Sequence, residues 1–464
     1  MFAQSNFRVD YGKARYDDLH FSDSDREVLR ELAKKVAEIA ARPVMAERKA
    51  LWTRHNDLQE TRPLILADPE NGWNEIITAD QILCRNNIAQ YWEFFLRKLI
   101  FWGDSLDDDF IVEAIFDLPH VYEETSWGVA GTLRHATLKS YEENGGAYHI
   151  EPVLTDYADI DKITRPELTI DFDKSARLLA TAHEIFDGIL QVRQHSVWYW
   201  SLGLTDEYAF LRGMENMLYD FYDEPENVHT VMNILTEGLL AKVDFLEQNG
   251  LYHLNNDFTY VGSGGIGCTT QLPAPDFAGQ ARARDLWLLS ESQITIGVSP
   301  AMFEEFIWPY QKRIADRFGL LCYGCCEPMD DRIEIVKQAK NLRRVSVSPW
   351  ANKAFMAEHL GADYVYSMKP SPTPLALSHL DEDEVRRELA TALDLAGVWT
   401  TDVIQQISNL TFVGTGQRPF LLFQGIREYI NGFSVRGNIS KAFTTLGYIT
   451  SRCIILNSTI RLLE

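Results

Sequence analysis

The sequence is poor in cysteine and has no long apolar run. Six cysteines in 464 residues are too few for a disulfide framework. No uninterrupted apolar stretch reaches the roughly 18–20 residues of a membrane span, and the polar N-terminus MFAQSNFRVDYGKARYDD does not resemble a secretory signal. We therefore expect a cytoplasmic protein with no membrane contact, in which clustered cysteines indicate metal binding or catalysis.

Positive charge is also scarce. The chain has 44 Lys and Arg against 67 Asp and Glu, which gives a formal net charge of −23. Such a chain repels a phosphate backbone, so nucleic acid and anionic membranes are set aside as partners. The same acidity also serves solubility alone.

Several sequence motifs are missing. There is no GxGxxG after a first strand, no P-loop, no HxC, no HExxH and no pair of CxxC motifs. Residues 262–267 (GSGGIG) carry glycines, but no strong helix signal follows them. Nucleotide binding is therefore not predicted.

Residues 1–160 are predicted to be a helical and irregular region packed on the main domain. The first helix begins with a capping pattern in which Ser24 is the side-chain acceptor. Apolar residues then recur at helical spacing, at Leu29, Leu32, Val36 and Ile39. A second amphipathic helix is expected over 78–100 and a loop over 143–149.

Helix and strand signals alternate over residues 161–410. Strands are expected at 251–257, 319–324, 342–349 and 362–370, with helices between them. This alternation predicts parallel βα units in an α/β fold, closed as a (β/α)₈ TIM-type barrel. An open doubly wound sheet is the second choice.

Helix boundaries within this region are marked by Gly250, by Ser299 with Pro300, and by a kink at Pro309. The remaining residues, 411–464, hold six basic and two acidic side chains. They either close the barrel or form an appendage.

Polar residues follow the expected strands, and parallel strands deliver their carboxyl ends to one rim. The residues are Asn255, Asn256 and Asp257, then Tyr323, Cys325, Cys326 and Glu327, then Ser346 and Ser348, then Ser367 and Lys369. Each has a plain alternative as well: Asp257 and Ser348 suit helix caps, and Lys369 suits a solvated position. Aromatic residues near these segments suit either core packing or a largely apolar ligand pocket.

The cysteines in FGLLCYGCCEPMDDR are the most informative polar group. Cys325 and Cys326 follow a strand and precede a helix, whose positive end favours a thiolate. Thiolate is also a soft ligand that suits zinc. Cys322 lies inside the apolar strand and is predicted to be a core residue.

Residues from about 205 to 370 resemble the uroporphyrinogen decarboxylase superfamily, and more closely its corrinoid-linked methyltransferase-like branch. The resemblance is carried by four segments, LRGMENMLYDFYDEPENVHTVMNILTEG, VSPAMFEEFIWPYQKRIADRFGLLCYGCCEP, NLRRVSVSPW and DYVYSMKPSP. It implies a (β/α)₈ barrel and methyl transfer between a small methylated substrate and a corrinoid protein. The N-terminal motif of the true decarboxylases is missing, so that reaction is not expected.

In the zinc-dependent members, His-x-Cys ends the strand that matches Tyr323-Gly324-Cys325, and a later cysteine would fall near Val398. The cysteine is kept at Cys325, the histidine is Tyr323, and the later cysteine is missing. Zinc would then need other donors, and the candidates in this chain are Cys326, Glu327, Asp257 and His149. The alternatives are a metal-free site and a chain that has lost the activity.

The resulting hypothesis is a corrinoid-protein-dependent methyltransferase that uses zinc and methylcobalamin or another corrinoid on a partner. Cys325 and Cys326 would bind the metal, Tyr323 and Ser348 would contact the cofactor, and Asp257, Glu327 and Lys369 would be catalytic. A cofactor-independent decarboxylase for a carboxylated substrate and a non-catalytic ligand-binding protein are the alternatives. A homodimer is compatible with the sequence.

Overall fold

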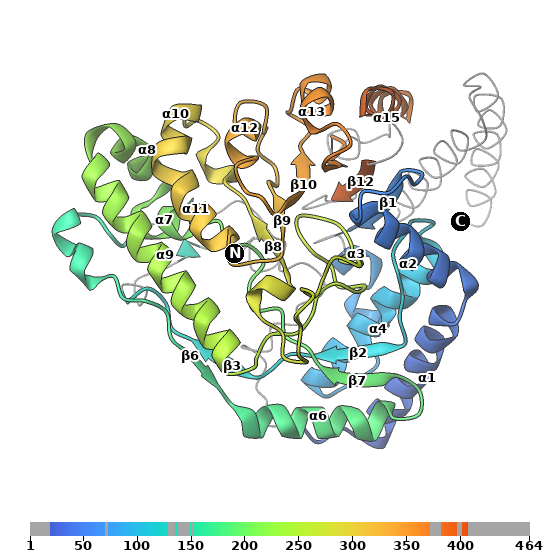
Figure 1. Cartoon of the computed structure of the whole chain (residues 1–464). Coiled ribbons are helices and arrows are strands. Elements are labelled where there is room, and N and C mark those ends of the chain that lie inside the picture. Colours follow the sequence, from blue (N-terminus) through green and yellow to red (C-terminus); the bar gives the residue numbers. More distant parts are fainter. Residues whose placement is uncertain are drawn as a thin grey trace, which may run out of the picture.

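The computed structural model describes residues 19–69, 73–128, 135–136, 149–150, 152–371, 382–396 and 401–406, and Figure 1 shows their arrangement. Its centre is a six-stranded sheet in which all neighbouring strands are parallel. In spatial order the strands are β1 (Leu64–Asp68), β12 (Thr401–Gln406), β11 (Val365–Met368), β10 (Leu342–Val347), β9 (Leu320–Tyr323) and β8 (Trp287–Ser290).

Smaller pairs of strands accompany the main sheet. β2 (Ile115–Leu118) and β7 (Gln191–Gln194) form a parallel pair. Two antiparallel pairs are short, β3 (Tyr122–Glu124) with β6 (Leu168–Ile170) and β4 (His135–Ala136) with β5 (His149–Ile150).

Helices precede the strands of the main sheet along the chain, which confirms the predicted parallel α/β class. α11 (Trp308–Ala315), α12 (Ile333–Val336), α13 (Lys353–Leu360) and α15 (Glu382–Ala396) come before β9, β10, β11 and β12 in turn. The strands β8, β9 and β11 are buried along their whole length, as expected of parallel strands covered on both faces. Among the described residues the main sheet and the β2–β7 pair are separate sheets, so closure into an eight-stranded barrel stays a prediction.

The strand expected over 251–257 is wrong, because this segment forms no regular structure. Side chains hold it in place instead. Trp198 Nε1 donates to the Leu251 carbonyl at 2.9 Å. The Asn255 side chain binds both the N–H and the carbonyl of Trp287, at 2.9 and 3.1 Å, where β8 begins. The run Asn-Asn-Asp disfavours a strand, and the asparagine side chain takes over the ladder's hydrogen bonds.

The first helix, α1 (Asp23–Ala40), begins two residues earlier than the predicted cap. Its N-cap is Ser22 rather than Ser24: the Asp25 N–H donates to Ser22 Oγ at 3.1 Å, and the Ser22 N–H donates to Asp25 Oδ2 at 3.2 Å. Phe21, just before this cap, is buried and its ring packs 5.0 Å from that of Trp92. Burial of the residue before the cap fixes the direction in which the chain enters the helix. The four apolar positions predicted for this helix are all buried.

Three other helix predictions have mixed outcomes. α4 (Asn87–Ser105) replaces the helix expected over 78–100, because Asn86 provides the cap by accepting two backbone N–H groups. α9 (Pro225–Gln248) ends just before Gly250, which has φ +65°, as predicted.

Ser299 caps α10 (Pro300–Met302), as predicted, and a π-helical turn follows before α11. Pro309 lacks an N–H, so the irregular turn falls where the kink was predicted.

The glycine-rich segment 260–267 is a hairpin that packs on the sheet and is closed by an antiparallel bridge. A Cβ atom on Gly262 would lie 2.4 Å from Cys322 Sγ, and one on Gly265 would lie 1.2 Å from Arg344 Nη1. Glycine is therefore required for the hairpin to approach β9 and β10 this closely.

The two faces of the main sheet have different surroundings. Tyr323 of β9 points toward α11, where its hydroxyl donates to Gln311 Oε1 at 2.6 Å. Arg344 of β10 points the other way, and its Nη2 donates to Asn56 Oδ1 at 2.6 Å. Because alternate residues of a strand share a face, Ser346 lies on the same side as Arg344. We call this side the inner face of the sheet.

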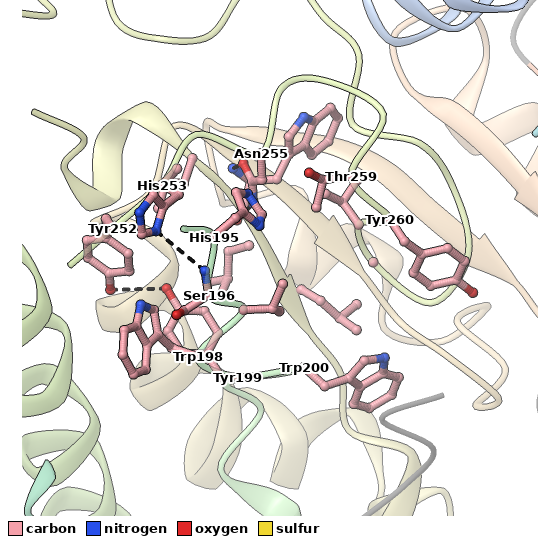
Figure 2. A pocket seen from close by; sticks show the side chains of 17 residues that line it. His195, Ser196, Trp198, Tyr199, Trp200, Tyr252, His253, Asn255, Thr259 and Tyr260 are labelled. Atoms are coloured by element: carbon pink, nitrogen blue, oxygen red, sulfur yellow. Dashed lines mark hydrogen bonds between the residues drawn. The ribbon is translucent and has the colours of Figure 1, made fainter. Parts of the chain in front are cut away.

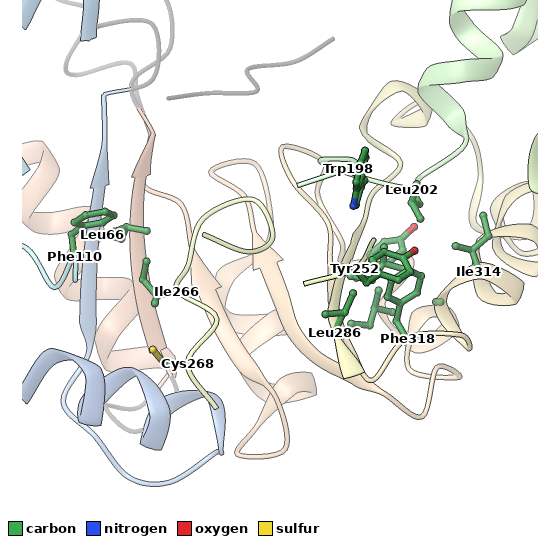
Figure 3. Packing of buried hydrophobic residues seen from close by; sticks show 14 of the residues in the cluster. Leu66, Phe110, Trp198, Leu202, Tyr252, Ile266, Cys268, Leu286, Ile314 and Phe318 are labelled. Atoms are coloured by element: carbon green, nitrogen blue, oxygen red, sulfur yellow. The ribbon is translucent and has the colours of Figure 1, made fainter. Parts of the chain in front are cut away.

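One connected apolar core joins the sheet, the N-terminal helices and α9. Figure 3 shows two parts of it, one beside β1 with Leu66 and Ile266, and one beside the start of β8 with Tyr252, Leu286 and Phe318. None of the described helices combines the length and the apolar character that a membrane crossing requires.

The N-terminal region supplies an outer strand of the main sheet. β1 pairs with β12, with Leu64 opposite Asp402. The division of the chain at residues 160 and 410 stays a prediction, and residues 137–148 and 411–464 lie outside the described part.

Candidate functional site

The carboxyl ends of β9, β10 and β11 bring polar side chains together. In the parallel register Ser346 lies opposite Ser367, and the Lys369 N–H donates to the Val347 carbonyl at 2.9 Å. Ser348 follows Ser346 by two residues, and Lys369 follows Ser367 by two. Since alternate positions share a face, Ser346 of β10 and Ser367 of β11, with Ser348 and Lys369 just past the ends of these strands, form one patch on the inner face. We call it the serine–lysine patch.

A vicinal thiol pair follows β9 and borders this patch. Cys325 Sγ and Cys326 Sγ are 3.6 Å apart, and Cys325 is buried whereas Cys326 is exposed. The hydrogen bond from Cys325 and, to a lesser extent, the positive charge of Lys369 lower the pKa of the Cys326 thiol to about 7, against the opposing effects of burial and Glu327. The same hydrogen bond, together with burial, raises the pKa of Cys325. Cys326 is thus the reactive thiol of the pair.

Lys369 is connected to the thiol loop by a chain of two hydrogen bonds. Its Nζ donates to Ser346 Oγ at 2.5 Å, and that hydroxyl donates to the Cys325 carbonyl at 2.7 Å. The side chain is only 5% exposed, and no carboxylate forms an ion pair with it among the described residues. A buried ammonium group without a counter-ion is unusual, because burial of an unpaired charge is costly.

Two hydroxyl groups of the serine–lysine patch are also unsatisfied. Ser348 Oγ and Ser367 Oγ are buried and have no hydrogen-bond partner among the described residues. Buried hydroxyls are nearly always paired in proteins, so an unpaired pair beside a buried cation indicates a place for a ligand.

Glu327 has a different position from the one expected of a catalytic acid. It is fully buried, and both carboxyl oxygens accept backbone N–H groups, one from Ser292 at 2.8 Å and one from Cys325 at 2.9 Å. The side chain therefore ties the loop after β8 to the thiol loop after β9.

Two residues were expected to contact a cofactor. Ser348 belongs to the serine–lysine patch, whereas Tyr323 lies on the opposite face and its hydroxyl is bonded to Gln311 of α11. Tyr323 is fully buried there. Tyr323 pairs with Val345 in the register of β9 and β10, so it lies on the face opposite Ser346, because successive residues of a strand alternate between faces.

Asp257 does not join the thiol group through any contact of the described residues. Its carboxylate pairs with Arg193 Nη1 of β7 at 2.9 Å and accepts the Thr259 N–H, also at 2.9 Å. Burial opposes ionisation, but Arg193 and the Thr259 hydrogen bonds together lower the pKa of Asp257. A carboxylate held so firmly in its charged form is a poor proton donor near neutral pH.

A separate pocket of about 80 Å³ lies between β7, the 251–257 segment and β8, and Figure 2 shows it. Aromatic side chains line it, among them Trp198, Tyr199 and Tyr252, together with His195 and His253. Burial lowers the pKa of His253 to about 3, and His195 adds to this effect. The His253 ring is therefore uncharged in this pocket at neutral pH.

Sequence reasoning missed three carboxyl groups with raised pKa values, Glu291 after β8 and Asp206 and Glu207 of α7 (Thr205–Arg212). Glu291 directly follows β8 and is buried, and burial beside Asp206 raises its pKa well above the usual range. Burial also raises the pKa of Asp206 to about 6 and that of Glu207 to about 7. The apolar run WLLS before Glu291 was the available signal, since it marks a buried strand.

The zinc hypothesis requires three protein ligands. Among the described residues no three His, Cys, Asp or Glu side chains gather so as to hold a metal ion. Glu327 already accepts two backbone N–H groups, Asp257 pairs with Arg193, and the side chain of His149 lies outside the described part. Cys325 and Cys326 alone do not fit a typical zinc site.

These features define a parallel α/β protein that carries a vicinal thiol pair and a buried lysine at the carboxyl edge of its sheet. No family model and no curated protein matches the chain. Of 23 solved chains that match, one is a methyltransferase from Methanosarcina mazei, with a TM-score of 0.45 and 10% identity over 82% of this chain and 98% of that one. At this level the likeness shows neither family nor chemistry, so the superfamily resemblance stays a prediction.

The pH dependence of Cys326 alkylation tests the thiol pair directly. The thiolate fraction rises with pH through the pKa, so the rate with iodoacetamide is expected to reach half its maximum near pH 7. Cys325→Ala removes the S–H donor, and the midpoint should move up toward the ordinary value of about 8.5. Peptide mass mapping assigns the label to Cys326, and an unchanged midpoint in the variant would show that Cys325 does not stabilise the thiolate.

Proposed function

We propose that this chain is a methyl-transfer enzyme in which Cys326 acts as the general acid and, in the reverse direction, as the general base. It moves a methyl group between a small methylated substrate and a corrinoid carried by a partner protein. The observation that supports this proposal is the exposed Cys326 thiol, whose pKa of about 7 suits a group that gives and takes protons at neutral pH. The four sequence segments described above supply the reaction class.

The role of Cys326 follows from the bonds that change. When the methyl group leaves the heteroatom of the substrate, the electron pair of that bond stays on the heteroatom. The Cys326 S–H donates its proton to this atom, and the resulting thiolate is stabilised by the Cys325 S–H and by Lys369. Because Cys326 is exposed, the thiolate regains a proton from water. In the reverse direction the thiolate takes the proton from the accepting heteroatom.

The test is demethylation of methylcobalamin, measured by its absorbance, with a panel of small thiol, amine and alcohol acceptors. Cys326→Ser and Cys326→Ala are expected to lower kcat by about 10²-fold or more, the usual contribution of a proton-transfer group. Cys84→Ala is the matched control, because it removes a buried thiol bonded to the N-terminal helix. Wild-type protein inert toward methylcobalamin and every acceptor, or full activity in Cys326→Ala, would refute the proposal.

A decarboxylase is the second candidate, and Lys369 is the observation that favours it. A buried ammonium group with no carboxylate partner among the described residues suits the carboxylate of a substrate. This function predicts substrate-dependent release of CO₂ without any corrinoid, and the release should survive Cys326→Ala. Loss of CO₂ release in that variant would assign the chemistry to the thiol instead.

A further inference from the structure

The serine–lysine patch also identifies the kind of substrate. We infer that Lys369, Ser348 and Ser367 bind a carboxylate group of the small substrate next to Cys326. That the bound carboxylate belongs to a substrate rests on the proposed function, but the binding site itself does not depend on the reaction.

Unsatisfied hydrogen-bonding capacity carries the inference. The ammonium group of Lys369 has three N–H donors, and Ser346 Oγ accepts one of them. No other acceptor binds Lys369 Nζ among the described residues. Ser348 Oγ and Ser367 Oγ are buried hydroxyls with no partner in the same part of the chain. A carboxylate offers about four lone-pair sites and can accept from all three residues at once.

Position and charge explain why the ligand is an anion. Lys369 and Ser367 follow one another on the inner face of β11, and Ser348 lies beside them after β10. The nearest carboxyl group of the loop, Glu327, is occupied by two backbone N–H groups and does not neutralise the lysine through a hydrogen bond. A bound carboxylate would supply the counter-charge that no side chain in the described part of the chain provides, and charge-assisted hydrogen bonds of this kind are the strong ones.

The site lies next to the reactive thiol. Ser346 Oγ joins Lys369 Nζ to the Cys325 carbonyl, so the lysine is two hydrogen bonds from the thiol loop. Cys326 directly follows Cys325 in that loop, and the positive charge of Lys369 lowers the pKa of its thiol. A short carboxylic acid anchored by Lys369 would therefore place its other end near Cys326 Sγ.

Alkylation of Cys326 by two matched reagents tests the site without any methyl transfer. Iodoacetate carries a carboxylate and iodoacetamide does not. In both cases the thiolate attacks the CH₂ carbon, the S–C bond forms, and iodide leaves with its electron pair. We take the rate with iodoacetate divided by the rate with iodoacetamide. Because both reagents react with the same thiolate, this ratio does not depend on the thiol pKa that Lys369 changes. We expect this ratio at Cys326 to be about tenfold higher in the native protein than in the urea-unfolded chain.

Variants separate the site from general electrostatics. Lys369→Gln should lower the ratio to the unfolded value, and Lys369→Arg should retain part of it. Ser348→Ala and Ser367→Ala should each lower the ratio with little change in the iodoacetamide rate. These two variants still test the site if Lys369→Gln does not fold. Lys337→Gln is the control, because Lys337 already pairs with Glu334. A ratio that is the same in wild type and Lys369→Gln would overturn the inference.

Protection experiments identify the anion. At equal ionic strength, propionate is expected to slow the alkylation of Cys326 by iodoacetamide, whereas propionamide should not. Protection by inorganic phosphate or methanesulfonate alone would overturn the assignment to a carboxylate. A raised ratio in a protein without methyl-transfer activity would refute the proposed function but support the carboxylate site. Methyl-transfer activity with an unchanged ratio would support the proposed function but refute the carboxylate site.

Discussion

Glu327→Ala is expected to destabilise the protein by about 3 kcal/mol or more, because the substitution leaves two buried N–H groups without an acceptor. Those groups belong to Ser292 and Cys325, which bind the two oxygens of the same carboxyl group at 2.8 and 2.9 Å. An unsatisfied buried donor costs about 1–3 kcal/mol. The loss also removes the link between the loops that follow β8 and β9. Urea unfolding followed by circular dichroism measures the change.

Glu327→Gln provides the matched comparison. Its amide keeps one acceptor oxygen and turns an NH₂ group toward the second backbone N–H, so destabilisation of about 2 kcal/mol is expected. Glu334→Ala, at an exposed position of α12, should change stability by less than about 0.5 kcal/mol. If Glu327→Ala were as stable as wild type and lost only activity, the carboxyl group would be catalytic, as the sequence predicted, rather than a link between loops.

Gly265→Ala is expected to destabilise the protein by about 3 kcal/mol, because the new Cβ would lie 1.2 Å from Arg344 Nη1. The guanidinium group cannot move aside without loss. It is fully buried, its Nη1 donates to the Gly264 carbonyl at 2.9 Å, and its Nη2 donates to Asn56 Oδ1 at 2.6 Å. Gly265 also has φ +147°, which a residue with a side chain rarely adopts.

Gly279→Ala separates the steric clash from the backbone conformation. Gly279 has φ +96°, and nothing lies within 4 Å of its hypothetical Cβ, so only the conformational cost of about 1 kcal/mol applies. Thermal unfolding of both variants measures the difference. Equal effects of the two substitutions would contradict the close packing of the hairpin on β10.

The two largest expected effects have a common origin. In each case the residue holds the structure together through a partner that the local sequence does not indicate. Glu327 follows a thiol pair and suggests an acid or a metal ligand, yet its oxygens bind backbone. No nucleotide binding was predicted for the glycines of residues 262–267, and in the structure they allow a hairpin to pack on the sheet. Local sequence indicates which residue types are present but not which partners they meet.

The thiol pair shows how far the sequence reached at the site. A strand that ends in Gly-Cys-Cys-Glu was sufficient to single out Cys325 and Cys326. The sequence could not assign their different roles, because these depend on burial: Cys325 is buried and Cys326 is exposed. It could not show either that Lys369 has no carboxylate partner among the described side chains, because this depends on which distant segments surround the lysine.

The sequence by itself determined the local elements. Apolar strand runs, helix caps and a proline are properties of neighbouring residues, so α9, β9, β10, β11 and the turn before Pro309 could be predicted from it. Only the tertiary structure decided which strand ends meet. The 251–257 segment has no strand structure, so Asp257 pairs with Arg193, while the register of β10 with β11 gathers Ser346, Ser367 and Lys369. Contacts between distant segments depend on how the whole chain packs, and a single sequence carries no direct record of them.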